Sequence, residues 1–247
     1  HTDAHARLKR LWFSSVTRSA ARGYNRIVAC SQPDFDMFAP IAKDNLTLIE
    51  NGVDLTKFAD RASLTPTKNL IAIGRFSFNK KPERLLGAMA ELGKSDPEFS
   101  LDLIGGEFDW TRDTLAAEIL ARNLGDRVRL HVGVSNEEIA RLIAGASLFV
   151  SASVHEGFGI SFIEALSAGL LPVVEANAAF KSFAARAPDV LLTDYAQPAK
   201  AADAILQAHA RLAADPAIRA RLISAAQPFA WPGVAERYMQ VYEEAAS

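Results

Sequence analysis

The stretch that decides the fold runs from residue 148 to residue 174 and reads LFVSASVHEGFGISFIEALSAGLLPVV. It begins and ends with short apolar runs, 148–150 and 172–174, and a helical pattern lies between them over 161–169. Strands that are apolar throughout are typical of a parallel sheet buried on both faces. The stretch therefore predicts one strand–helix–strand unit, the building block of such sheets.

The same alternation extends in both directions along the chain. Further apolar runs that we expect to be strands lie at 27–30, 46–49, 70–73, 101–104, 128–132 and 190–192. Candidate helices lie near 83–93, 111–123, 136–145 and 199–213, with more helix over 216–246 that breaks near Trp231-Pro232-Gly233. The fold class predicted is α/β, a doubly wound, Rossmann-like parallel sheet. Such sheets bind ligands at the carboxyl ends of their strands.

Composition narrows the class of protein further. The 247 residues are 49% hydrophobic and 23% charged, as in ordinary globular domains. A net charge of −2 argues against a dedicated nucleic-acid binder, and the one cysteine, Cys30, favours a reducing compartment. No apolar run approaches the roughly 20 residues of a membrane span. Because the chain starts at His1 rather than at a methionine, we expect a fragment of a longer protein.

The loop Glu156-Gly157-Phe158-Gly159 follows one of these strands and opens a helix. Its glycines allow a ligand to approach the backbone closely, and the helix N-terminus favours an anion such as a diphosphate. Glu164 lies about one turn into the helix, where a carboxylate can accept hydrogen bonds from the vicinal diol of a ribose. The pattern Ser161-x-x-Glu164 also fits a capping box, which needs no ligand.

Two more loops leave strand ends. Gly74-Arg75 with Lys80 places two cations where they can converge on a pyrophosphate, although a basic turn can also be simply solvated. The pair Gly105-Gly106 indicates close approach of the backbone to a ligand or to a neighbouring element. A dinucleotide GxGxxG fingerprint, a Walker A loop and a close set of histidine ligands are all absent from the sequence, which disfavours an oxidoreductase, an NTPase or a metalloenzyme.

Five motifs occur in an order that resembles one known family. They are 49–54 (IENGVD), Gly74-Arg75 with Lys80, 128–135 followed by 137–139 (VRLHVGVS, then EEI), Glu156 and Glu164 at E-x7-E spacing, and 165–169 (ALSAG). From about Arg26 to about Tyr242 the chain resembles the C-terminal, nucleotide-sugar-binding domain of retaining GT-B glycosyltransferases of group 1, also called family 4.

The resemblance implies a role for each motif. Glu164 would hold the ribose hydroxyls, and Arg75 and Lys80 would neutralise the diphosphate. The catalytic residues implied are Glu156, Arg75 and Lys80. The donor-binding residues implied are Gly74, Arg75, Lys80, His131, Val132, Gly133, Glu156, Gly157, Phe158, Gly159, Ile160 and Glu164, with the segment from His131 to Gly133 facing the base mostly through its backbone. Members of the family are generally metal-independent, so no metal or other cofactor is expected.

The sequence departs from the family pattern at three places. Lys81 stands where the family usually has glycine, and Gly169-Leu170-Leu171-Pro172 is one residue longer than usual. The glycine-rich loop that often touches the sugar is replaced by residues 175–180 (EANAAF). These motifs therefore do not identify the nucleotide or the sugar of the donor.

We expect residues 1–31 to be the end of an N-terminal acceptor domain plus a linker, and 32–247 to be the C-terminal nucleotide-sugar-binding domain with its closing helices. Segment 1–26 reads as a basic amphipathic helix, with Leu8, Leu11, Trp12 and Val16 at helical spacing. The chain most resembles α-mannosyltransferases of bacterial exopolysaccharide assembly, of the xanthan and acetan type.

That resemblance implies a GDP-mannose donor, an acceptor oligosaccharide linked to polyprenyl diphosphate, no nucleic-acid partner, and a cytoplasmic enzyme held peripherally on the inner face of the cell membrane. The fragment alone is expected to be inactive, because the acceptor domain is almost entirely missing. A UDP-glucose-dependent enzyme and an inert nucleotide-sugar-binding module are the alternatives.

Overall fold

The computed structural model describes residues 13–42 and 44–246. The chain divides into two compact units, Val53–Ala230 and a smaller unit that joins His1–Gly52 to Trp231–Ser247. The expected domain boundary at residue 31 stays a prediction. Leu8, Leu11 and Trp12 of the expected amphipathic helix lie outside the described residues.

The larger unit is built on a six-stranded parallel sheet, which confirms the predicted α/β, doubly wound fold. Its strands are β3 (Asn69–Ile73), β4 (Ser100–Gly105), β5 (Val128–Val132), β6 (Leu148–Ser151), β7 (Leu171–Glu175) and β8 (Leu191–Thr193). They lie in the order β5-β4-β3-β6-β7-β8. The order runs outward in both directions from the neighbours β3 and β6, so the topological switch point lies between these two strands.

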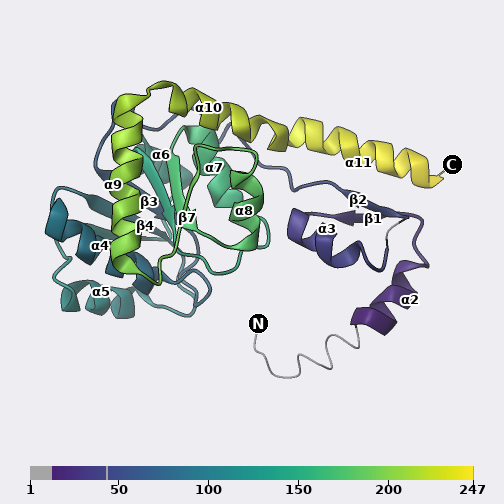
Figure 1. Cartoon of the computed structure of the whole chain (residues 1–247), viewed down its shortest axis with the longest axis horizontal. Coiled ribbons are helices and arrows are strands. Elements are labelled where there is room, and N and C mark those ends of the chain that lie inside the picture. Colours follow the sequence, from purple (N-terminus) through teal and green to yellow (C-terminus); the bar gives the residue numbers. More distant parts are fainter. Residues whose placement is uncertain (1–12, 43, 247) are drawn as a thin grey trace. The chain divides into compact units, whose positions relative to one another are not determined.

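Helices cover both faces of this sheet, as the apolar strands require. They are α4 (Pro82–Ser95), α5 (Arg112–Ala121), α6 (Asn136–Ala144), α7 (Ile160–Ala168), α8 (Ala178–Ala184), α9 (Pro198–Ala214) and α10 (Ala217–Ala226), followed by a short 3₁₀ turn, η2 (Gln227–Phe229). In Figure 1 the strands lie between α4 with α9 and α7 with α8. Leu70, Leu101 and Val173 are fully buried, so the core follows the centre of the sheet.

The smaller unit holds the remaining elements. They are a π-helical turn, η1 (Phe13–Thr17), α2 (Arg18–Ala21), β1 (Ile27–Ala29), α3 (Gln32–Phe38), β2 (Leu46–Leu48) and α11 (Trp231–Ala246). The strands expected at 27–30 and 46–49 pair in parallel with each other and do not join the large sheet. Ile49, Val234 and Val241 form the core of this unit. None of the helices in the described part of the chain is long and apolar enough to cross a membrane.

The expected break in the C-terminal helices is placed slightly wrongly by the sequence pattern. The helix is interrupted over Gln227–Phe229 and at Ala230, whose backbone is extended, and α11 begins at Trp231 itself. Pro232 therefore lies in the first turn of α11, where the missing N–H of proline has no helical partner to lose. The proline marks the start of a helix here rather than the end of one.

Candidate functional site

Two loops meet at the switch point of the sheet. The loop after β3, residues 74–81, and the loop after β6, residues 152–159, leave the carboxyl ends of adjacent strands. The backbone N–H of Val154 donates to the Asn79 carbonyl oxygen at 2.9 Å, and the Asn79 side-chain amide donates to the His155 carbonyl oxygen at 3.1 Å. These bonds fix one loop against the other at the place where doubly wound sheets bind their ligands.

An ion pair joins the same two loops. Lys80 Nζ donates to Glu156 Oε1 at 2.5 Å, and only 26% of the lysine side chain and 10% of the glutamate side chain are exposed. Gly74, Arg75 and Lys80 also line one small cavity of about 30 Å³. The structure thus brings together four of the expected donor-binding residues: Gly74, Arg75, Lys80 and Glu156.

Arg75 is held differently from Lys80. Its guanidinium carbon lies 5.1 Å from the centroid of the Phe108 ring, a cation–π contact that leaves the hydrogen-bonding edge of the guanidinium available. Within the described residues Arg75 forms no ion pair. Arg75 is therefore a second positive charge at this site. An anionic ligand can bind it without displacing a carboxylate.

Glu164 is a buried carboxylate in the second turn of α7, and it does not cap the helix. The N-cap residue of α7 is Gly159, which has φ 100° and a left-handed backbone that favours glycine, and no side chain caps this end. The capping-box interpretation of Ser161 and Glu164 is therefore wrong. Glu164 is 8% exposed, and its Oε1 accepts a hydrogen bond of 2.9 Å from Lys57 Nζ.

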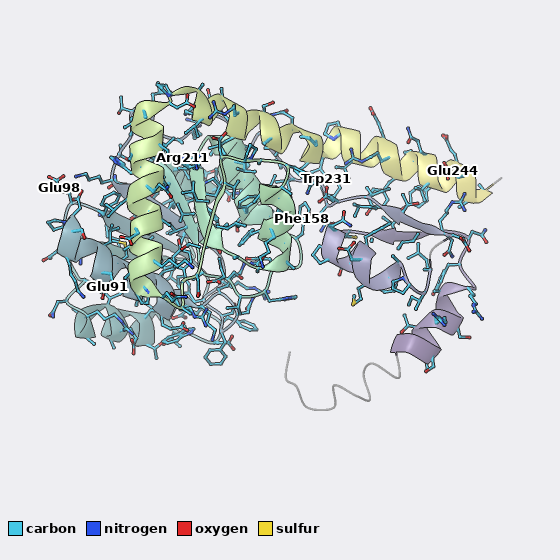
Figure 2. The ribbon with its side chains drawn as sticks, in the orientation of Figure 1. Glu91, Glu98, Phe158, Arg211, Trp231 and Glu244 are labelled. Carbon is cyan, nitrogen blue, oxygen red and sulfur yellow. The ribbon has the colours of Figure 1, made fainter. Side chains whose placement is uncertain are left out.

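The loop between Glu156 and α7 is anchored by Phe158, which Figure 2 labels. This ring is 6% exposed and contacts the Phe183 and Phe229 rings edge to face, with centroids 5.5 and 5.7 Å away. Its side chain belongs to the core, so only its backbone is available to a ligand. Ile160, the first residue of α7, is 52% exposed, and a Cβ added at Gly157 would meet open space.

His131 lies on β5 with its side chain committed to a neighbour. Its Nε2 lies 2.8 Å from Asp102 Oδ1, and Arg129 donates to both oxygens of the same carboxylate at 2.7 and 2.9 Å. Burial pushes the pKa of Asp102 upward, but the hydrogen bonds from Arg129 and His131 outweigh it and hold that pKa below its ordinary value. The segment from His131 through half-buried Val132 to Gly133 therefore has mainly backbone to offer a ligand.

Lys81 has an uncommon backbone for a lysine. It is the N-cap residue of α4 and lies in the left-handed region, with φ 51° and ψ 50°. Its Nζ is 3.8 Å from Glu83 Oε1, which is too long for a hydrogen bond. A left-handed conformation costs a non-glycine residue about 1–2 kcal/mol. The position therefore suits the glycine that the family pattern has there.

Lys81→Gly is expected to stabilise the chain. The relief of backbone strain should exceed the extra entropy that glycine has in the unfolded state, so the free energy of unfolding should rise by about 0.5–1 kcal/mol in urea denaturation. Glu91→Gly, within the same helix, is the control and should lower it by about as much. A less stable Lys81→Gly variant would show that the lysine side chain stabilises the fold in its own right.

Three residues that hold the site together carry no motif in the sequence: Lys57, Asn79 and Asn177. Asn177 donates to the Ser153 carbonyl oxygen at 2.8 Å, and its Oδ1 accepts from the Phe180 N–H at 2.9 Å, which makes it the N-cap of α8. An asparagine before an apolar run is a helix-start signal, so Asn177 could have indicated the start of α8 from the sequence. Asn79 and Lys57 act across the chain and gave no local signal.

Metal ligands do not gather anywhere in the described residues: no three histidine, cysteine, aspartate or glutamate side chains come together as a group that could hold a metal ion. The acidic residues of the candidate site are each matched with a cation instead, Glu156 with Lys80 and Glu164 with Lys57.

Comparison with known proteins gives a family and a set of relatives. Residues 55–228 match the family model of glycosyl transferases group 1. The chain is 34% identical over 248 residues to the GDP-mannose:cellobiosyl-diphosphopolyprenol alpha-mannosyltransferase of Komagataeibacter xylinus, covering 99% of this chain and 62% of that protein. It is 33% identical over 250 residues to the enzyme of the same name from Xanthomonas campestris, covering 99% of this chain and 65% of that protein.

Among solved structures, the sucrose-phosphate synthase of Thermosynechococcus elongatus superimposes with a TM-score of 0.76 and 25% identity, covering 94% of this chain and 61% of that one. The match supports the prediction that the chain has the fold of the C-terminal half of a GT-B glycosyltransferase. The chain spans under two thirds of the length of each of these relatives.

Proposed function

Because the chain belongs to the group 1 glycosyltransferase family, we propose that its Val53–Ala230 unit binds the nucleotide-sugar donor of a retaining mannosyltransferase, with GDP-mannose as that donor. The observation that carries the proposal is the Lys80–Glu156 pair, which joins the loops of β3 and β6 across the switch point of the sheet. The choice of guanine as the nucleotide base and of mannose as the sugar comes from the activity named for the relatives.

The donor is proposed to enter with its diphosphate at Lys80 and Arg75. Phosphate oxygens compete with Glu156 for the Lys80 ammonium, and Arg75 adds a fork of donors without losing a carboxylate partner. The two cations then stabilise the charge that develops on the leaving diphosphate, so that no metal ion is required. Glu156, released from Lys80, is left to contact the transferred sugar together with the backbone of Gly157 and Gly159.

The whole reaction is proposed to involve more protein than this chain, which spans under two thirds of the relatives' length. We propose that mannose is transferred to an oligosaccharide linked to polyprenyl diphosphate, and that this 247-residue chain alone does not catalyse the transfer. Positioning of the acceptor hydroxyl accounts for a large part of the rate, and residues outside this chain would supply it. Transfer by the chain alone at the rate of the longer protein would contradict this division of labour.

Association with the inner face of the cell membrane is part of the same proposal, since the acceptor is a lipid. Basic residues near an anionic surface contribute about 1 kcal/mol each, and segment 1–26 carries Arg7, Lys9 and Arg10 among others. Salt-sensitive sedimentation with anionic vesicles, lost when these three residues are changed to glutamine, would support a role of this segment. No binding at low salt would remove it from the proposal.

The experiment that tests the donor is calorimetric titration of the chain with GDP, UDP and ADP. Tightest binding of GDP supports a GDP-mannose donor, whereas preference for UDP supports the UDP-glucose alternative. An inert nucleotide-sugar-binding module would bind GDP in the same way, so the enzyme is separated from it by transfer activity of the longer protein. Absence of binding to all three nucleotides would contradict the proposed function.

Glu164→Gln tests the ribose contact. The substitution removes the charge that attracts the ribose hydroxyls and keeps the shape of the side chain, so GDP binding is expected to weaken by about 1–2 kcal/mol. Paired calorimetry and thermal melting separate binding from stability. Unchanged affinity, with the whole effect in the melting temperature, would mean that Glu164 serves only the fold.

A further inference from the structure

Lys57, a residue outside every motif of the sequence, holds the carboxylate of Glu164. Its Nζ donates to Glu164 Oε1 at 2.9 Å. Both residues are largely covered: 29% of the Lys57 side chain and 11% of the Glu164 side chain are exposed. In the part of the chain that the structure describes, Lys57 is the one hydrogen-bond donor to this carboxylate.

The segment that carries Lys57 is fixed on both sides of the lysine. Before it, Asp54 Oδ1 accepts from the backbone N–H of Thr56 at 3.0 Å and from the Thr56 hydroxyl at 2.6 Å, which closes a turn. After it, Phe58 is 1% exposed and anchors the segment in the core. The Lys57 ammonium lies over the Phe58 ring, with Nζ 4.7 Å from the centroid. The aspartate that ends the Asn51-Gly52-Val53-Asp54 motif thus shapes the turn that presents Lys57.

We propose that Lys57 is a positioning residue for the donor's ribose, a role that rests on the proposed function of Glu164. The lysine occupies Oε1 and holds the carboxylate in one orientation, which leaves Oε2 to accept from the ribose hydroxyls. A carboxylate offers about four lone-pair positions, so one bond to Lys57 leaves enough for a vicinal diol. Because the lysine side chain is covered and bonded to Glu164, its effect on the ligand passes through Glu164.

A double-mutant cycle tests this role. Lys57→Met, Glu164→Gln and the double variant are titrated with GDP and with 2′,3′-dideoxy-GDP, which lacks both ribose hydroxyls. Lys57→Met is expected to weaken GDP binding about tenfold and to leave dideoxy-GDP binding unchanged. In the Glu164→Gln background the same substitution is expected to have no further effect on GDP. Lys57→Arg, which keeps a cation, should restore most of the lost affinity.

Three outcomes would overturn the proposal. Equal weakening of GDP and dideoxy-GDP, or a loss that persists beside Glu164→Gln, would mean that Lys57 acts on the diphosphate. Tighter GDP binding by Lys57→Met would mean that the lysine competes with the ribose for Glu164. An absence of GDP binding by the unmodified chain overturns the proposed function itself, which distinguishes the two failures.

Folding is controlled within the same set of variants. Lys57→Met leaves the buried Glu164 carboxylate without its partner, which could prevent folding. The double variant, Lys57→Met with Glu164→Gln, has no such carboxylate, so its comparison with Glu164→Gln completes the test even if Lys57→Met does not fold. Lys68→Met is the matched control, because Lys68 is similarly exposed, at 32%, and pairs with Asp96 at 2.7 Å. It should leave the affinity for both nucleotides unchanged.

Discussion

Lys80→Ala is expected to weaken GDP binding by about 1.5–3 kcal/mol, the contribution of a charge-assisted hydrogen bond to a phosphate. The loss has two physical sources. The diphosphate loses a cation, and Glu156, with only 10% of its side chain exposed, keeps its charge without a partner beside the ligand. Calorimetry measures the affinity. Lys94→Ala is the control, because Lys94 pairs with Glu91 on the surface of α4; Figure 2 labels Glu91.

The partner of Lys80 separates the two sources. Lys80→Ala with Glu156→Gln removes the cation and the unpaired carboxylate together, so it should recover part of the affinity lost in Lys80→Ala. Glu156→Gln alone frees Lys80 from its competitor, so it should bind GDP at least as tightly as the unmodified chain. An unchanged affinity in Lys80→Ala, with a normal melting temperature, would contradict the placement of the diphosphate between these loops.

The sequence predicts the strands of the large sheet well because their burial leaves a direct trace. A strand covered on both faces needs apolar residues throughout, and β3, β6 and β7 were located within one residue on that ground alone. Short elements leave less trace. The seven-residue helices α3 and α8 were not predicted, because each presents too few turns to show a helical period.

The candidate site was predictable in part for a similar reason. Loops at strand ends are visible in the sequence, so Arg75, Lys80, Glu156 and Glu164 were found. The pairs that they form were not, because the order of the strands decides which loops meet. Lys80 and Glu156 are 76 residues apart in the chain, and Lys57 and Glu164 are 107 apart. No local pattern spans such distances, and Lys57 became visible only when the chain was folded.

The glycine pair after β4 shows how the structure resolves an ambiguity in the sequence. The two residues differ in their surroundings. A Cβ added at Gly105 would lie 1.9 Å from the carbonyl oxygen of Gly74 and 2.9 Å from the Phe76 ring, whereas one added at Gly106 would meet nothing within 4 Å. Gly105 therefore allows a neighbouring strand end to approach, and that strand end begins the loop that carries Arg75 and Lys80.

Gly105→Ala is expected to lower the free energy of unfolding by about 3 kcal/mol, at the upper end of the cost of overpacking, because the atom it strikes belongs to the backbone. The Gly74 N–H also donates to the Ile104 carbonyl oxygen at 3.0 Å, so a shift of Gly74 strains this bond as well. The same shift moves Arg75 and Lys80, and GDP binding should weaken in the protein that remains folded. Gly106→Ala is the adjacent control and should change stability by no more than about 0.5 kcal/mol. Urea denaturation measures both variants, and equal stabilities would mean that β3 and β4 are not packed as closely at this end as the structure has them.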